Sequence, residues 1–392
     1  MSNVLLYDAE LITPFDSIEH GAILINENGK ILSAGFLEDF QEIPRDTIRL
    51  RLTGKRLLPG LIDVHVHGGY GANFGTGDLL KDLRHYSREI VQTGVTAFLP
   101  SVFAETPDGL VAMIKEYVRI FENEQIVGAQ PIGLHLEGPF LNPEKKGAFT
   151  ASWLRLPNLD EAKRYLEAGK EWIKQITIAP ELPRADEVAT LFRQAGVVVA
   201  MGHTNADYET ATKALRGAFN HITHTFNAQR GFDHRAPGVF GAILSSDLPT
   251  AELIADNIHV HPASMKVLER CVGVERIVLI TDAIAGTGLP DGEYNLMTYS
   301  VKVVNGKVTL PDGTLAGSTA KLNQCVCNAA EAMQVSFCEA AQMASLNPAY
   351  MMGVADERGS LVEGKRADIT VLDDSGQVCL TIVAGEIVYN NL

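Results

Sequence analysis

Apolar runs rich in β-branched residues alternate with amphipathic, helix-like stretches through the middle of the chain. This alternation is typical of parallel strands joined by crossover helices. Eight such units, spread over about 300 residues, predict an α/β fold built on a (β/α)₈ TIM-like barrel. The candidate strands are Leu58–His65, Val95–Pro100, Pro131–Glu137, Gln175–Ala179, Val197–His203, His221–Phe226, Glu252–Asp256 and Ile277–Asp282.

The two ends of the chain have a different pattern, in which short strand-like runs are separated by turns. Asn28-Gly29 lies between the runs Ala22–Ile25 and Lys30–Ser33, and an Asn-Gly step in this position is a strong hairpin signal. The C-terminal runs Ala367–Leu372 and Val378–Val388 have the same character. We therefore expect a small β-sandwich domain made of residues 1–55 and 360–392, and a barrel domain made of residues 56–359.

A further hairpin is expected after the eighth strand. The segment Tyr294–Gly313 contains the steps Asn305-Gly306 and Asp312-Gly313, which are both turn signals. We predict that this insertion lies over the top of the last strand.

Composition and charge narrow the classes of partner. The chain has 392 residues, with 33 Lys and Arg against 48 Asp and Glu, and its formal net charge is −15. This acidic excess argues against nucleic acid and against a membrane surface, since both bind dense basic patches. We find no secretory signal, no apolar run of about 18 residues and no dense cysteine framework, so we expect a soluble cytoplasmic protein.

Polar side chains fall at the ends of the predicted strands. In a (β/α)₈ barrel the carboxyl ends of all strands meet at one face, where such enzymes hold their catalytic groups. A His-x-His pair on a strand also places both imidazoles on the same side. The pattern predicts a metal site at the barrel mouth, with candidate residues His65, His67, Glu137, His203, His224 and Asp282.

Imidazole nitrogen and carboxylate oxygen indicate zinc or iron(II) rather than calcium or magnesium. Single histidines are more often surface or core residues, and we interpret His20, His85, His234 and His261 in this way. His135 shares a strand face with Glu137 but lies one layer deeper, so we expect it to support the site by hydrogen bonds. The odd spacing from His224 predicts that His221 points away from the barrel interior.

Several runs resemble a known family. Pro59–Gly68 is similar to the first-strand signature of the amidohydrolase superfamily, which hydantoinases and dihydroorotases share. Six further runs together resemble the N-acetylglucosamine-6-phosphate deacetylases of that superfamily. The most specific of them are His135–Phe140 and Thr223–Ala228. The six runs are His135–Phe140, Met201–Thr204, Thr223–Ala228, Ile254–His259, Thr281–Ala283 and Leu315–Ser318.

The resemblance implies that Glu137, His203 and His224 hold the principal divalent metal. His65 and His67 make a second metal possible, with Glu137 as the bridge. A metal in such a site activates water and polarises the amide carbonyl. Asp282 is the candidate to take a proton from the water and pass it to the leaving amine; an N-cap of the next helix is the structural alternative for this aspartate.

The implied reaction is the hydrolysis of N-acetyl-D-glucosamine 6-phosphate to D-glucosamine 6-phosphate and acetate, a step of amino-sugar catabolism. Related enzymes take some phosphate contacts from a second subunit, so we expect a homodimer. Arginine suits phosphate because its guanidinium binds two oxygens at once. The implied substrate contacts are Ala148, Phe149, Asn227, Ala228, Arg235, Asp256, His259, Leu315, Ala316 and Gly317.

One residue departs from the family pattern, and it keeps alternatives open. Phe149 stands where many relatives have a histidine, and phenylalanine cannot donate a hydrogen bond. The galactosamine epimer is therefore an alternative substrate. A cyclic amidase is a second alternative, but it predicts a lysine in place of Glu137. A metal-free scaffold is the non-enzymatic alternative, and it predicts replaced ligands.

Overall fold

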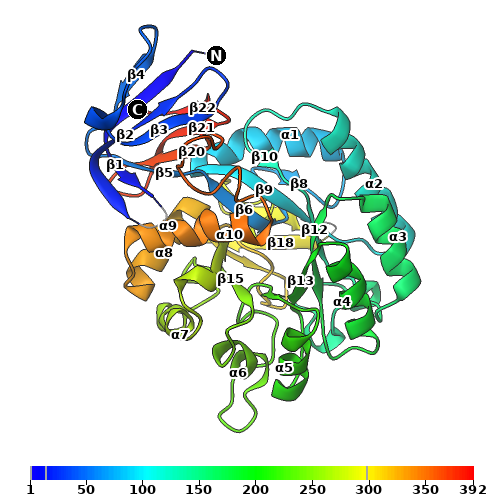
Figure 1. The fold of residues 1–392 in the computed structure, drawn as a ribbon. Coiled ribbons are helices and arrows are strands. Elements are labelled where there is room, and N and C mark those ends of the chain that lie inside the picture. Colours follow the sequence, from blue (N-terminus) through cyan, green and yellow to red (C-terminus); the bar gives the residue numbers. More distant parts are fainter. Residues whose placement is uncertain (1, 14–15, 297–298) are drawn as a thin grey trace.

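The computed structural model describes residues 2–13, 16–296 and 299–392, and its centre is a barrel of parallel strands (Figure 1). Each predicted barrel strand overlaps an observed one, and the observed strands neighbour one another in chain order, which confirms the (β/α)₈ prediction. A short strand, β10 (Gln130–Pro131), precedes the third barrel strand. The eight are β6 (Leu61–Val66), β9 (Val95–Val102), β11 (Leu134–Glu137), β12 (Ile173–Ile178), β13 (Val198–Met201), β14 (His221–Ile222), β15 (Thr250–Ile254) and β16 (Ile277–Ile280).

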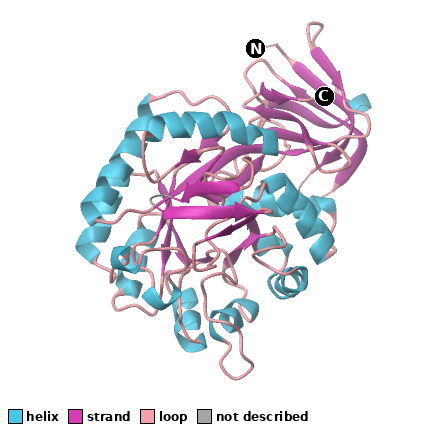
Figure 2. Cartoon of the chain, turned by 180° about the vertical axis from the view of Figure 1, so that it is seen from behind, coloured by secondary structure: helices cyan, strands magenta, loops and turns pink. Residues whose placement is uncertain are grey.

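Helices surround the barrel, as Figure 2 shows from the opposite side. Several helices are preceded by a residue whose side chain caps free backbone N–H groups. Examples are Asp78, before the helix that begins at Leu79, and Asn158, before the helix that begins at Leu159. No helix in the described part of the chain has the length and apolarity needed to span a bilayer. The helices are α1 (Leu79–Glu89), α2 (Pro107–Asn123), α3 (Leu159–Gly169), α4 (Ala185–Gln194), α5 (Tyr208–Arg216), α6 (Gly238–Leu244), α7 (Pro262–Val272), α8 (Leu322–Met333), α9 (Phe337–Ala344) and α10 (Leu346–Met351).

Backbone hydrogen bonds join the first and last barrel strands at their carboxyl ends. The N–H of Asp282 donates to the carbonyl of His65 at 2.9 Å, and the N–H of His67 donates to the carbonyl of Ala283 at 2.8 Å. These contacts bring the residues that follow β16 beside the His-x-His pair of β6. The closure of the barrel therefore assembles one part of the predicted metal site.

Both ends of the chain form one β-sheet domain beside the barrel (Figure 1). The predicted Asn28-Gly29 hairpin is confirmed, and Gly29 adopts the left-handed φ of +72° that the turn requires. The division at residues 55/56 and 359/360 stays a prediction. The strands are β1 (Val4–Ile12), β2 (Ser17–Ile25), β3 (Ile31–Phe36), β4 (Ile48–Arg51), β5 (Arg56–Pro59), β20 (Ile369–Leu372), β21 (Val378–Val383) and β22 (Glu386–Asn390).

The inserted hairpin lies where it was predicted, and a third strand extends it into a small antiparallel sheet. It consists of β17 (Gly292–Leu296), β18 (Tyr299–Val304) and β19 (Lys307–Thr309), and residues 297–298 of the predicted segment lie outside the described residues. Its buried apolar side chains pack on Ile284 and Ala316, which both follow the eighth barrel strand. The first barrel strand, β6, is followed by a two-stranded ribbon of β7 (Gly68–Gly69) and β8 (Ala72–Asn73).

Candidate metal centre

Three predicted ligands form a compact buried group at the ends of the third, fifth and sixth barrel strands. Glu137 ends β11, while His203 and His224 follow β13 and β14 closely. Oε1 of Glu137 lies 3.1 Å from Nε2 of each histidine, and the two Nε2 atoms are 3.0 Å apart. Three donor atoms at such spacing fit around one small cation, because zinc binds nitrogen and oxygen at about 2.0–2.2 Å.

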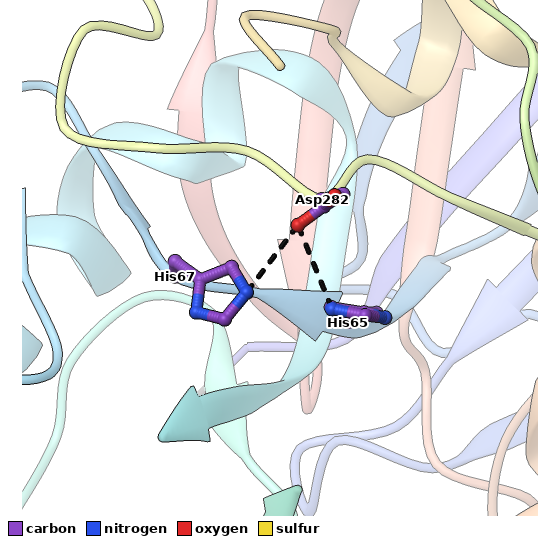
Figure 3. A group of neighbouring side chains, drawn as sticks. All are labelled: His65, His67 and Asp282. Atoms are coloured by element: carbon purple, nitrogen blue, oxygen red, sulfur yellow. Dashed lines mark ion pairs between the residues drawn. The ribbon is translucent and has the colours of Figure 1, made fainter. Parts of the chain in front are cut away.

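The remaining three predicted residues form a second group. Oδ1 of Asp282 lies 3.5 Å from Nε2 of His65 and 3.3 Å from Nε2 of His67. Figure 3 shows the carboxylate and the two imidazoles converging on one point. All three side chains are largely or completely buried. The six predicted residues are therefore brought together, in two sets of three.

The carboxylate of Glu137 joins the two groups. Its Oε1 contacts His203 and His224, whereas its Oε2 lies 2.9 Å from Nε2 of His67. Oε1 also lies 3.6 Å from Nε2 of His65. A carboxylate placed between two ligand sets is suited to bridge two ions, as the family resemblance implies.

The tautomers of the histidines show that a cation fits these groups. Nδ1 of His203 donates to the carbonyl of Lys145 at 2.8 Å, and Nδ1 of His67 donates to the carbonyl of Ser101 at 3.1 Å. Because a carbonyl oxygen only accepts, each Nε2 of a neutral ring presents its lone pair to the acidic side chains. Lone pairs facing carboxylate oxygens repel one another unless a cation lies between them.

The pKa values of side chains in the two ligand groups are shifted by their close contacts. Burial lowers the pKa of His67, but its contacts with Asp282 and Glu137 outweigh burial and raise that pKa to about 9. Burial raises the pKa of Glu137, yet the histidines around it, His65 first, hold the net pKa well below its usual range. The site therefore favours positive charge, supplied either by protons or by a metal ion.

The backbone is strained where these side chains leave their strands. His203, His224 and Asp282 have φ values of +46°, +26° and +51°. Residues other than glycine rarely adopt this left-handed region, and strain of this kind gathers at functional sites. The conformation turns each side chain from its strand end into the barrel mouth.

Sequence reasoning missed a buried carboxylate behind both groups. Oε2 of Glu252 accepts hydrogen bonds from Nδ1 of His65 and from the N–H of His224, both at 2.9 Å. Its Oε1 accepts from Gln175 at 2.7 Å and from His221 at 3.1 Å. The only signal in the sequence was an acidic residue inside the apolar run of the seventh strand.

The predictions made for His135 and His221 have different outcomes. His135 donates or accepts at both ring nitrogens, with Ser101 at 2.9 Å and Thr177 at 2.8 Å, which confirms its predicted supporting place. The prediction that His221 points away from the interior is wrong, because it contacts Glu252. β14 has only two residues, so alternation counted from His221 to His224 does not apply.

The ligand groups line a cavity of about 350 Å³ at the barrel mouth. The predicted contacts Ala316 and Asp256 do not line this cavity; Oδ2 of Asp256 contacts Nδ1 of His259 at 2.8 Å. Burial lowers the pKa of His259, but Asp256 outweighs it and raises that pKa above its ordinary value. Arg235 lies outside the cavity, in an exposed turn. The predicted contacts that line the cavity are Ala148, Phe149, Asn227, Ala228, His259, Leu315 and Gly317.

Several lining residues were not foreseen. They are mainly apolar, and only Phe226, in the run Thr223–Ala228, belongs to a motif, so the sequence marks most of them only as hydrophobic. Two belong to the inserted hairpin, whose position depends on tertiary packing. These residues are Phe103, Phe226, Leu296, Tyr299 and Thr314.

Comparison with known proteins places this site in a family. Residues 56–388 match the profile of the amidohydrolase family. The chain belongs to the amidohydrolase family. It is 33% identical to the N-acetylglucosamine-6-phosphate deacetylase of Bacillus subtilis (strain 168) over 398 residues, which cover 99% of this chain and 97% of the relative. The N-acetylgalactosamine-6-phosphate deacetylase of Escherichia coli O157:H7 is 36% identical over 334 residues, covering 84% and 87%.

A solved structure shows the same likeness in three dimensions. A variant of the N-acetyl-D-glucosamine-6-phosphate deacetylase from Mycobacterium smegmatis, in complex with N-acetyl-D-glucosamine 6-phosphate, has a TM-score of 0.91 and 32% identity, and the match covers 100% of each chain. The predicted resemblance and fold are thus confirmed. This amidohydrolase is a hydrolase of a metal-dependent family, and its structure holds two groups of three side chains that could bind a metal ion.

Proposed function

We propose that this amidohydrolase hydrolyses N-acetyl-D-glucosamine 6-phosphate to D-glucosamine 6-phosphate and acetate. The observation that carries the proposal is the pair of ligand groups joined by Glu137 in one cavity, beside the polar residues Asn227 and His259. Its relatives named for this activity span nearly the whole chain. Acetate release by the metal-loaded protein is the test.

Asp282 is the proposed catalytic residue. A divalent ion bound by Glu137, His203 and His224 would act as a Lewis acid on the amide carbonyl and on water. Asp282 faces the cavity from the opposite ligand group, so its carboxylate can accept the proton of the attacking water. The same carboxyl group then protonates the leaving amine, without which an amide does not cleave readily.

We further propose zinc or iron(II) as the metal, in one or two positions. Four imidazole nitrogens and two carboxylates make a donor set that suits these ions. The group of Glu137, His203 and His224 is the principal site in this proposal, and the group of His65, His67 and Asp282 is the second. Elemental analysis of protein prepared without chelator gives the metal and the number of ions per chain.

We propose that the two ends of the substrate bind on different sides of the metal groups. Asn227, Ala228 and His259 follow the sixth and seventh strands and would meet the sugar phosphate, while the loop Leu315–Gly317 closes on the sugar. The raised pKa of His259 favours its cationic form, which suits a phosphate despite the overall charge of −15, because local donors outweigh a distant field. Ala148 and Phe149 would contact the substrate on the other side of the metal groups.

A homodimer is proposed to complete the phosphate site. Arg235 lies in an exposed turn outside the cavity, where it is free to reach a second copy of the chain. A guanidinium delivered from a partner would add a bidentate phosphate contact. We also propose a cytoplasmic location, which the five unpaired cysteines support.

N-acetyl-D-galactosamine 6-phosphate remains the alternative substrate. The specific observation in its favour is Phe149, which brings no hydrogen-bonding group to the cavity. A relative named for that activity is 36% identical to this chain. The two sugars differ only in the orientation of one hydroxyl group, so parallel assays on both decide between them.

A further inference from the structure

One side of the barrel mouth carries polar residues, and we call it the polar half although Phe226 also lines it; the other side is an aromatic half. Asn227 and His259 follow the sixth and seventh strands, on one side of the ligand groups. Phe103 follows β9 and Phe149 lies in the loop after β11, so both come from the second and third strands. In the order of the barrel, these two pairs of strands lie on different sides.

The aromatic half is a packed structure, which we call the aromatic wall: Phe103, Phe149, Trp153 and Tyr299. The ring of Phe103 meets the ring of Phe149 edge to face, with centroids 4.3 Å apart. Trp153 packs on Phe103 and on Tyr299, at 5.5 and 5.6 Å. The hydroxyl of Tyr299 also accepts a hydrogen bond from the N–H of Thr150 at 2.9 Å, which ties the inserted hairpin to the loop after β11.

The wall reaches the principal ligand group. The ring of Phe149 packs edge to face on the imidazole of His203, with centroids 5.0 Å apart. Phe149 and Phe103 are both only 6% exposed, yet they line the cavity with Tyr299. An apolar surface therefore begins directly beside the place where the scissile amide must lie.

A trans amide places its two substituents on opposite sides of the C–N bond. If the sugar phosphate occupies the polar half, as the proposed function requires, the acyl substituent points to the aromatic wall. Three rings line the cavity on that side, so an acyl chain longer than one methyl group would meet apolar side chains there. We propose that the aromatic wall is an acyl-binding subsite, and that the enzyme hydrolyses N-acyl hexosamine 6-phosphates whose acyl chain is longer than acetyl.

The chemistry of the reaction is unchanged by the longer chain. Water adds its oxygen to the acyl carbon, the C–N bond breaks, and the nitrogen gains a proton, so the products are a fatty carboxylate and the amino sugar phosphate. Each methylene buried on the wall contributes about 0.8 kcal/mol, which corresponds to about fourfold in kcat/KM. This inference rests on the proposed function and deepens it.

The test compares N-acetyl-, N-propanoyl- and N-butanoyl-D-glucosamine 6-phosphate, with release of the common amino sugar as the readout. We expect kcat/KM to be maintained or to rise by up to about fourfold for each added methylene. Phe149→Gln makes the wall polar. In this variant, kcat/KM for the butanoyl substrate, divided by kcat/KM for the acetyl substrate, should fall by about tenfold. In Phe149→Leu, which keeps it apolar, the ratio should fall much less.

Phe36→Gln is the matched control, because Phe36 lies exposed in the terminal sheet. Metal content of each variant shows whether His203 has kept its place. If the enzyme hydrolyses the acetyl substrate but its kcat/KM for the propanoyl substrate is more than about tenfold lower, the inference is overturned and the proposed function stands. An unchanged butanoyl-to-acetyl ratio in Phe149→Gln also overturns it. Absence of hydrolysis with all three compounds overturns the proposed function, and this inference with it.

Discussion

Glu252 accepts a hydrogen bond from Nδ1 of His65 at 2.9 Å, and both side chains are completely buried. This contact fixes which ring nitrogen of His65 faces Glu137 and Asp282. The free Nε2 of His65 has no hydrogen-bond partner among the described residues. Since Glu252 also holds the N–H of His224, one carboxylate orients a member of each ligand group.

Glu252→Gln should weaken metal binding by about 10- to 100-fold, because it replaces a charged acceptor behind His65 with an amide. The metal affinity is measured by competition with a chromophoric chelator. Glu38→Gln is the control, since Glu38 lies exposed in the terminal domain. If Glu252→Gln binds metal as tightly as the unaltered protein, Glu252 does not orient the ligands.

Asp282→Asn should lower kcat by on the order of 10² or more, because the amide cannot accept the proton of the attacking water. The ion held by Glu137, His203 and His224 should remain, since Asp282 belongs to the other group. Turnover and metal content are measured on the same preparation. Unchanged turnover would remove Asp282 from the proposed mechanism.

Arg235→Ala should raise KM for the sugar phosphate and leave the bound metal in place, because Arg235 lies outside the cavity of its own chain. Mixing Arg235→Ala chains with Asp282→Asn chains gives a sharper result. In a mixed dimer, one site has both an intact Asp282 and a partner with an intact Arg235. Activity should therefore recover on mixing and re-association; no recovery would contradict a shared site.

Asp368→Ala should lower the free energy of unfolding by about 3–5 kcal/mol, because it leaves the buried Arg358 without its partner. Asp368 accepts from Arg358 at 2.6 Å and from the N–H of Ala384 at 2.7 Å, so it links the barrel side to the terminal sheet. Denaturant titration measures the loss. The exposed Asp356→Ala is the comparison and should change stability little; an equal loss in both variants would refute this role.

The sequence was sufficient to predict the barrel and the six polar residues that meet at its mouth, for a physical reason. Strands are short apolar runs of definite position, and a barrel sends all their carboxyl ends to one face. A polar residue at such an end, such as Glu137 or His203, is therefore placed in space by its position in the chain. The structure adds that His203, His224 and Asp282 reach the mouth through left-handed backbone, which no local pattern signals.

What the sequence could not predict depends on contacts between distant elements. Glu252 acts on His65 from 187 residues away, and only the closed barrel brings them together. Tyr299 lies 149 residues from Thr150, whose N–H donates to its hydroxyl. His221 was misplaced because its strand is too short for alternation to continue.

The central claim is that the paired ligand groups serve the deacetylation of an N-acetylhexosamine 6-phosphate. Its most direct test is acetate release by the metal-loaded protein from N-acetyl-D-glucosamine 6-phosphate, with the galactosamine epimer in parallel. We predict turnover of about 1–10³ s⁻¹ on the glucosamine compound, lost with chelator and restored by zinc or iron(II). Protein that contains its metal and releases acetate from neither sugar would contradict the claim.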